Sequence, residues 1–347
     1  QLFMPVPHVI AQHGFGGELV VQANLGDAVD VAQGLCHLEL RVVVEPPRKG
    51  IDDLLLVQPR AARPAHGQNE GEAKAGVVVR IELLDARIPA SSGNPMLADI
   101  IRDKPRMIAL NKADLADAAT TKKWLEYFRA RGIAAVAIDS VKGKGMKQLV
   151  KEAEELARPK TDKFVSKGGR PREARCMILG IPNVGKSSLI NRLAGAAKAK
   201  TADKPGVTRA KQWIKIGSNL DLLDTPGILW PKFEDRMVGL KLAFTGAIND
   251  DIYDRQQVTI LLLDVLRRDY PERVIERFKL KETLPDDGLE LLETIGRKRG
   301  CLVKGGVIDM EKAQNIVLNE FRAGKLGNVS LDEVPGKKKQ EDEKNIE

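Results

Sequence analysis

One eight-residue segment constrains the fold of this chain more than any other. Residues 180–187 read Gly-Ile-Pro-Asn-Val-Gly-Lys-Ser and match the pattern GxxxxGK[ST]. An apolar run at 176–179 precedes the segment, and a helical pattern at 186–194 follows it. Glycines let the backbone wrap closely around phosphate groups at a helix N-terminus. The pattern predicts a phosphate loop in which Lys186 reaches the β- and γ-phosphates and the Ser187 hydroxyl binds Mg²⁺.

Strand and helix patterns alternate through the middle of the chain. The expected order is strand 77–84, strand 107–110, helix 120–131, strand 134–138, helix 147–157, strand 176–179, helix 186–194 and strands 212–216 and 220–223. Such alternation is typical of a parallel α/β sheet. Residues 158–175 are basic, contain Gly and Pro, and are expected to form a mobile linker. Beyond about residue 240 only helical patterns remain, at 258–268, 272–278, 288–297 and 310–321, so an all-α domain is expected there.

A second motif, Asp224-Thr225-Pro226-Gly227, closes the apolar strand that ends at residue 223. A carboxylate at this place holds Mg²⁺ through water, and the amide of Gly227 contacts a γ-phosphate. Between the two motifs lies Pro-Gly-Val-Thr, whose Thr208 is expected to give Mg²⁺ a second hydroxyl in the triphosphate state.

A third motif points to the base. Asn111-Lys112-Ala113-Asp114 follows the strand at 107–110. The carboxylate of Asp114 accepts from the ring N–H and the exocyclic amine of guanine, a pattern that adenine lacks, so the unpaired carboxylate would select against adenine. Asn111 is expected to brace the loop, and the stem of Lys112 to lie on the base face. The loop at 139–143 is expected to contact the base oxygen through its backbone.

The motifs stand in an unusual order. A conventional GTPase runs from the phosphate loop through the switch Thr and DxxG to NKxD and the base loop, but here NKAD and the base loop come first. The sequence therefore predicts a P-loop GTPase fold with circularly permuted motif order, in which the switch after Gly227 leads into the helical domain and couples to it. The candidate GTP-binding residues are Asn111, Lys112, Ala113, Asp114, Asp139, Ser140, Asn183, Val184, Gly185, Lys186, Ser187, Ser188, Thr208 and Gly227, and the candidate metal ligands are Ser187, Thr208 and Asp224.

Charge and histidine are unevenly distributed. The first 75 residues carry 6 Lys/Arg and 9 Asp/Glu, a net charge of −3, whereas the remaining 272 carry 50 and 39, a net charge of +11. All four histidines lie in the first 66 residues, which excludes a Ser-His triad or a histidine-ligated zinc elsewhere. The three separated cysteines give no disulfide framework, and no apolar run approaches the roughly 20 residues of a membrane span. A cytoplasmic protein is expected.

The motifs in combination resemble ribosome biogenesis GTPase A, a circularly permuted bacterial assembly factor. The resemblance covers about residues 77–330, and it rests on DARIP at 85–89, NKAD, GIPNVGKSS, DTPGILWPKFED at 224–235 and KRGCL at 298–302. It implies a GTPase that binds late precursors of the large ribosomal subunit and leaves after hydrolysis. The helical domain would contact ribosomal RNA, which suits the +11 charge, and no DNA partner is expected. It also implies stimulation by K⁺, with Asn183 at the matching position.

The catalytic group is not assigned. Gly227 is followed by Ile228, where many GTPases have the glutamine that orients water, so hydrolysis is expected to be slow alone and stimulated by the ribosomal subunit. The resemblance implies a catalytic histidine within an N-terminal motif WFPGHM, which this sequence lacks. Two alternatives stay open: a nucleotide-gated RNA-binding scaffold with little hydrolysis, and a GTPase of another RNA pathway, such as tRNA modification or an organellar ribosome.

Residues 1–76 do not resemble the family. One set of codons for residues 66–71, shifted by one base, reads Met-Ala-Lys-Thr-Lys, which is similar to the family's run after that histidine. We hypothesise that this segment is a wrong-frame or wrongly extended translation; the alternative is a genuine divergent extension. The expected division is therefore an atypical, irregular segment at 1–76, a GTPase domain at 77–240, a helical RNA-binding domain at 241–330 and a disordered charged tail at 331–347.

Overall fold

The chain divides into two compact units, Gln1–Leu56 and Val57–Glu347, and each is described by itself. The computed structural model describes residues 10–13, 19–22, 78–95, 105–169, 173–195, 212–216, 220–225, 229 and 235–336. In the first unit, strands β1 (Ile10–His13) and β2 (Leu19–Gln22) pair antiparallel. This strand pair differs from the irregular structure expected for 1–76, because strands of four residues are too short for an alternating pattern to be recognised.

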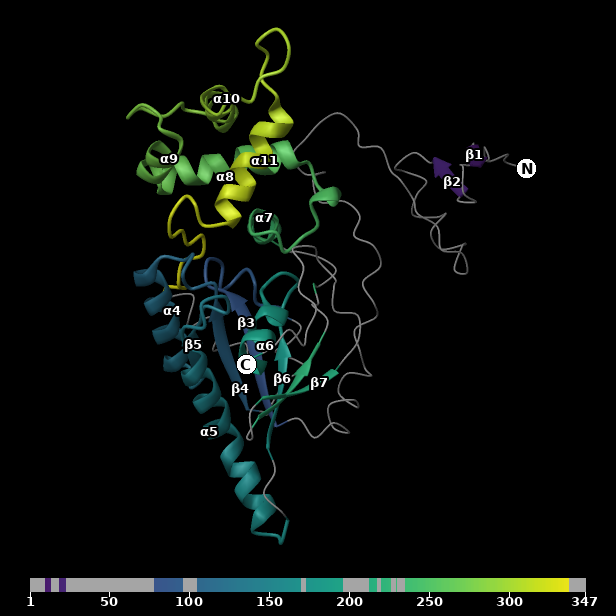
Figure 1. Cartoon of the computed structure of the whole chain (residues 1–347), viewed down its shortest axis with the longest axis vertical. Coiled ribbons are helices and arrows are strands. Elements are labelled where there is room, and N and C mark those ends of the chain that lie inside the picture. The colour runs from purple at the N-terminus through teal and green to yellow at the C-terminus, as the bar shows by residue number, and fades with distance from the viewer. Residues whose placement is uncertain are drawn as a thin grey trace, which may run out of the picture. The chain divides into compact units, whose positions relative to one another are not determined.

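A six-stranded sheet forms the centre of the second unit (Figure 1). Its order is β5-β4-β3-β6-β8-β7, with β7 antiparallel to β8 and the other neighbours parallel. The strands are β3 (Val79–Asp85), β4 (Arg106–Asn111), β5 (Ala134–Ala137), β6 (Ala174–Leu179), β7 (Gln212–Ile216) and β8 (Leu220–Asp224). Every expected strand is present within two residues of its predicted ends. The carboxyl ends of β3, β4, β6 and β8 therefore bring the sequence motifs to one edge of the sheet.

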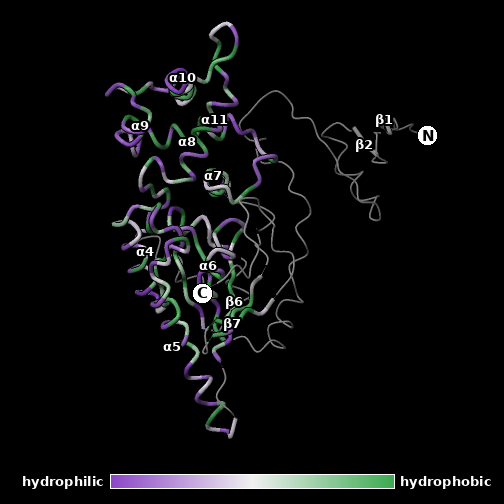
Figure 2. The backbone as a smooth tube through the Cα atoms, viewed as in Figure 1, coloured by the Kyte–Doolittle hydropathy of each residue, from purple (hydrophilic) through white to green (hydrophobic). Residues whose placement is uncertain are grey.

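Helices cover both faces of this sheet. Leu83 and Met107 contribute to one apolar core together with α5 (Met146–Val165) and α6 (Lys186–Ala194). Their neighbours Leu84 and Ile108 contribute to a second core with α4 (Ala118–Ala130). Successive side chains of a strand point to opposite faces, which explains why adjacent residues belong to different cores. Hydrophobic stretches of the tube lie in the region of the sheet around β6 (Figure 2).

Helix α5 is longer than expected. It passes through Pro159 and ends at Val165, so the first part of the expected linker is helical. Proline removes one backbone hydrogen bond but leaves those of the following turn, where the amides of Gly168 and Gly169 donate to carbonyls of the last helical turn. None of the residues of α5 beyond Ala157 is buried, and the helix continues past the strands (Figure 1).

The described residues 235–336 are mainly helical. They contain α7 (Arg236–Phe244), a 3-10 turn (Asp250–Ile252), α8 (Arg255–Asp269), α9 (Pro271–Phe278), α10 (Gly288–Lys298) and α11 (Met310–Arg322). Helices α8, α10 and α11 pack on one another. Aspartates begin α7, α8, α10 and α11, where Asp235, Asp254, Asp287 and Asp309 each accept a backbone N–H of the first turn.

The structure differs from the sequence prediction at two expected domain boundaries, 240/241 and 330/331. The division between residues 240 and 241 lies within α7. Residues 331–336 differ from the expected disordered tail: the amide of Leu331 donates to the carbonyl of Arg87 at 2.7 Å, and Asp332 is buried. The charged composition that suggested disorder begins only after Gly336, and the residues beyond it lie outside the described structure.

Candidate functional site

The phosphate loop connects β6 to α6, as the sequence predicts. Asn183 and Gly185 have positive φ values of 55° and 100°, so the loop curls before the helix begins. The Lys186 ammonium is buried and donates to the carbonyls of Gly180 (2.9 Å) and Ile181 (2.8 Å). Ser187 and Ser188 lie in the first turn of α6, where backbone N–H groups attract an anion.

Asn111 joins three of the predicted motifs. Its side-chain amide donates to the carbonyl of Val184 at 2.8 Å, and its side-chain oxygen accepts from the amide (3.1 Å) and hydroxyl (2.8 Å) of Ser140. A Cβ at Gly185 would overlap the Asn111 nitrogen, so this close approach requires glycine. The end of β4, the loop at 139–143 and the phosphate loop are therefore joined at one residue.

The base loop is held by its own carboxylate. Asp139 is buried, and its Oδ1 accepts from the amides of Val141 (2.8 Å) and Lys142 (2.9 Å). Asp139 therefore shapes the loop through hydrogen bonds to its backbone. The amide of Ala113 donates to the carbonyl of Ile138 at 3.1 Å, which ties the NKAD segment to β5.

Asp114 lies at the outer end of the NKAD segment. Its side chain is 31% exposed, and Lys142 Nζ lies 3.7 Å from its Oδ2. Lys112 has a φ of 57°, and its ammonium lies 3.1 Å from Asp85 Oδ2. Anchoring the ammonium at Asp85 leaves the methylene stem of Lys112 as the part that could meet a base.

Sequence reasoning gave no role to the buried pair beneath Lys112. Arg87 donates from Nε and NH2 to both oxygens of Asp85, at 2.9 and 2.7 Å. Burial alone would raise the pKa of Asp85, but the charges of Arg87 and Lys112 outweigh it and hold that pKa well below its usual range. Asp85, the first residue of the DARIP segment, is therefore ionised at neutral pH and orients the ammonium of Lys112.

The end of β8 lies beside the phosphate loop. Leu223 pairs with Met177 of β6, so Asp224 follows next to the start of the phosphate loop. The hydroxyl of Thr225, to which the sequence assigned no role, donates to the carbonyl of Ile178 at 2.6 Å and fixes this junction. The predicted residues Thr208 and Gly227 lie outside the described residues.

Two of the predicted metal ligands, Ser187 and Asp224, offer oxygen donors. Ser187 lies in the first turn of α6, which follows β6, and Asp224 is the last residue of β8, the strand next to β6. Mg²⁺ prefers such hard oxygen donors and is bound through few protein ligands. The residues present therefore fit Mg²⁺.

The phosphate loop also contacts the helical part of the second unit, residues 235–336. Asn183 donates from its side-chain amide to the carbonyl of Gly246, just after α7, at 2.8 Å. Arg322 of α11 donates to the carbonyls of Ala243 (2.8 Å) and Phe244 (3.1 Å) in the same turn. Hydrogen bonds thus link the phosphate loop to the end of α7 and the end of α7 to α11. This link is additional to the chain connection expected after Gly227.

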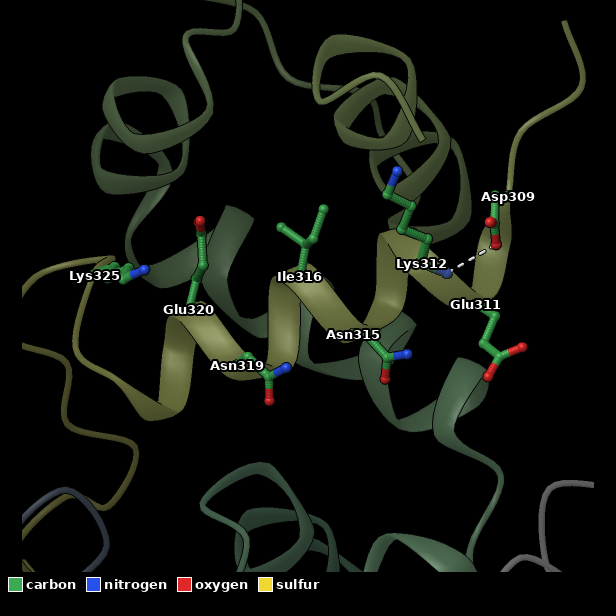
Figure 3. Close-up of a pocket in the computed structure, with 8 residues that line it drawn as sticks. All are labelled: Asp309, Glu311, Lys312, Asn315, Ile316, Asn319, Glu320 and Lys325. Carbon is green, nitrogen blue, oxygen red and sulfur yellow. Dashed lines mark hydrogen bonds between the residues drawn. The ribbon is translucent and has the colours of Figure 1, made fainter. Parts of the chain in front are cut away.

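A surface hollow of about 520 Å³ lies elsewhere, along α11 (Figure 3). It is lined by Asp309, Glu311, Lys312, Asn315, Ile316, Asn319, Glu320 and Lys325, none of them a predicted site residue. Glu320 is occupied by Arg277 and Arg299.

Known proteins match both the sequence and the fold. Residues 175–292 match the family described as 50S ribosome-binding GTPase. Ribosome biogenesis GTPase A of Bacillus cereus is 53% identical over 254 residues, which are 73% of this chain and 86% of that protein. The protein of the same name from Priestia megaterium is 54% identical over 253 residues, 73% of this chain and 88% of that protein. The chain belongs to the ribosome biogenesis GTPase A family.

Solved structures agree with this membership. GDP-bound TM YlqF has a TM-score of 0.53 and 29% identity, covering 76% of this chain and 98% of that one. GNP-bound YlqF from T. maritima has a TM-score of 0.52 and 29% identity, covering 77% and 97%. The expected circularly permuted P-loop GTPase fold is confirmed, and this family member is a GTPase. Among the described residues, no helix has the length and apolar character to cross a bilayer.

Proposed function

We propose that this GTPase acts in the cytoplasm in late maturation of the large ribosomal subunit, binding a subunit precursor and leaving it after GTP hydrolysis. The observation that best supports GTP binding is the set of hydrogen bonds at Asn111, which joins the NKAD segment to the phosphate loop and to the loop at 139–143. The names of the relatives support the ribosomal part, as does the net charge of +11 beyond residue 75.

The nucleotide would lie along the carboxyl edge of the sheet. The amides of the phosphate loop, with Val184 and Gly185, would surround the phosphates, and Lys186 would exchange its two carbonyl partners for phosphate oxygens. Asp114 would read guanine, with the stem of Lys112 on the base face. Thr208 and Gly227 keep their predicted roles at the γ-phosphate end.

Two cations would accompany the nucleotide. Ser187, Thr208 and Asp224 would hold Mg²⁺, which supplies charge neutralisation on the phosphates. Asn183 would be a ligand for K⁺ through its side-chain oxygen, because its nitrogen already donates to Gly246. Omitting K⁺ from the assay should then slow turnover in the native chain but not in Asn183→Ala.

Ribosomal RNA would be contacted by the helical part. Lys298 at the end of α10 and Lys304 in the following loop are exposed, and no described residue forms an ion pair with either. Cations on a surface of this kind bind RNA phosphates and release counterions. Replacing both with Gln should weaken binding to subunit precursors at low salt and make that binding less dependent on salt concentration. Lys122→Gln with Lys123→Gln on α4 provides a control with the same charge change.

Co-sedimentation tests this function directly. Purified protein should sediment with large-subunit precursors in the presence of a non-hydrolysable GTP analogue and dissociate with GDP or high salt. A chain that binds GTP but never sediments with these particles in any nucleotide state contradicts the proposal.

The apolar Ile228 after DTPG favours one alternative, a nucleotide-gated RNA-binding scaffold with little hydrolysis. Precursor particles should accelerate GTP turnover if the chain is an assembly GTPase that completes its catalytic site on the particle. Tight GTP-dependent binding without acceleration would favour the scaffold. Activity on tRNA or on organellar ribosomes alone would favour another RNA pathway.

A further inference from the structure

A short segment after α11 covers the base-reading loop. We call residues 328–332 the C-terminal strap and residues 111–117 the base-reading loop. The side-chain amide of Asn328 donates to two carbonyls of this loop, those of Asp114 (3.0 Å) and Ala116 (2.8 Å). One asparagine therefore fixes the backbone on both sides of Leu115.

The contact continues residue by residue. The amide of Val329 donates to the carbonyl of Leu115 at 3.0 Å, and the amide of Asp117 donates to the hydroxyl of Ser330 at 3.1 Å. Four successive residues of the base-reading loop, 114–117, are thus hydrogen-bonded to three successive residues of the strap. These hydrogen bonds restrain the backbone of the loop at four successive residues.

The far end of the strap is anchored in the GTPase part. Asp332 is 4% exposed and accepts from the amide (2.7 Å) and hydroxyl (2.9 Å) of Ser91 and from Lys241 Nζ (2.7 Å). Its carbonyl accepts from the indole of Trp124 at 3.3 Å. The anchor joins the loop after β3, helix α4 and helix α7, so the strap cannot slide along the base-reading loop.

We propose that Asn328 is a positioning residue for guanine recognition, acting through the backbone of Asp114. The inference rests on the proposed role of Asp114 in reading guanine. The Asp114 carboxylate is partly exposed, so its place is set by the backbone that carries it. Holding that backbone before the base arrives lowers the ordering cost of the two hydrogen bonds to guanine.

The experiment compares GDP with inosine diphosphate (IDP), which lacks the exocyclic amine of guanine. Dissociation constants of both are measured for the full chain, Asn328→Ala and Asn328→Asp. Asn328→Ala should lose about tenfold in GDP affinity but less in IDP affinity, because a loosened carboxylate loses more where it makes two hydrogen bonds than where it makes one. The GDP/IDP affinity ratio therefore falls, and Asn328→Asp, which removes the donors and adds a charge beside two carbonyls, lowers it further.

Tyr270→Phe is the matched control. The Tyr270 hydroxyl donates to the carbonyl of Ser330 at 2.7 Å and accepts from its amide at 3.1 Å, on the strap but away from the base-reading loop. Its GDP/IDP ratio should equal that of the native chain even where its melting temperature falls. If Asn328→Ala does not fold, Asn328→Ser, which keeps one donor, is measured in its place.

The outcomes separate the inference from the proposed function. A ratio that falls only in the Asn328 variants supports the positioning role. A proportional loss of GDP and IDP affinity that follows the melting temperature overturns it. A native chain that does not prefer GDP to IDP shows instead that Asp114 does not read guanine, and the proposed base-reading role fails independently of Asn328.

Discussion

The side-chain amide of Asn111 donates a hydrogen bond of 2.8 Å to the carbonyl of Val184, a residue 73 positions further along the chain. The first residue of NKAD is therefore a structural part of the phosphate loop. The order of the two motifs along the chain does not alter this relationship, because both lie at the same edge of one sheet. The permuted chain thus recovers the site geometry through contacts between β4 and the turn after β6.

Asp114→Asn should change the preferred base. The amide nitrogen of asparagine repels the N–H groups of guanine but pairs with the additional oxygen of xanthine. We expect a loss of about a hundredfold in GDP affinity and a gain for xanthosine diphosphate, measured by competition binding. Asp117→Asn makes the same chemical change in the same loop, at the residue that caps α4, and should leave the preference unaltered. Unchanged GDP selectivity in Asp114→Asn would refute the base-reading role.

Gly185→Ala should destabilise the phosphate loop. The alanine would have to keep a φ of 100°, and its Cβ would overlap the side chain of Asn111. Together these lower the free energy of unfolding by about 2–4 kcal/mol. Gly195→Ala carries only the conformational cost, about 1 kcal/mol, because nothing lies within 4 Å of its Cβ position at a φ of 65°. Urea unfolding of the two variants measures the difference, and equal midpoints would mean that Asn111 moves aside freely.

Cys176 should resist alkylation in the folded protein. Burial in β6 raises the pKa of its thiol to about 12, so the reactive thiolate is almost absent at pH 8. Iodoacetamide should label Cys176 only when urea unfolds the chain, as followed by peptide mass spectrometry. Labelling of the folded protein at the rate of a free thiol would contradict the structure of β6.

The ion pair between Arg322 and Asp250 should make the free energy of unfolding depend on pH in the acidic range. Burial tends to raise the pKa of Asp250, but hydrogen bonds from Arg322 and Tyr253 outweigh it and lower that pKa. A carboxyl whose pKa is lower in the folded state stabilises the fold above its unfolded pKa, and this contribution is lost as pH falls through the folded pKa. Arg322→Gln should cost about 2 kcal/mol at pH 7 and less near pH 3. Urea titrations across this range give the two differences, and a cost independent of pH would assign it to the carbonyl contacts of Arg322 alone.

Resequencing the start of the gene tests the hypothesis for residues 1–76. A frameshift within the codons for residues 66–76 is the expected result, together with an upstream frame that encodes the family's histidine motif. An intact frame through codon 80, with peptides detected from residues 1–60, would establish the segment as genuine.

The sequence predicts those parts of the site that depend on local pattern. The strands, the phosphate loop and NKAD follow from short runs of residues whose side chains act near one another. Thr225 and Asp332 could not be found in this way, because their partners Ile178 and Ser91 lie 47 and 241 residues away. The length of α5 was missed for a different reason, since Pro159 interrupts the pattern although it removes only one hydrogen bond.

The strap also bears on how the protein is made. Asp114 and Asn328 are 214 residues apart, and the phosphate loop is synthesised between them. Domains fold as they leave the ribosome, so a nascent chain displays both nucleotide motifs long before the segment that holds the base-reading loop in shape has been translated. On the proposed role of Asn328, guanine selectivity would therefore be complete only after residue 328 has been synthesised.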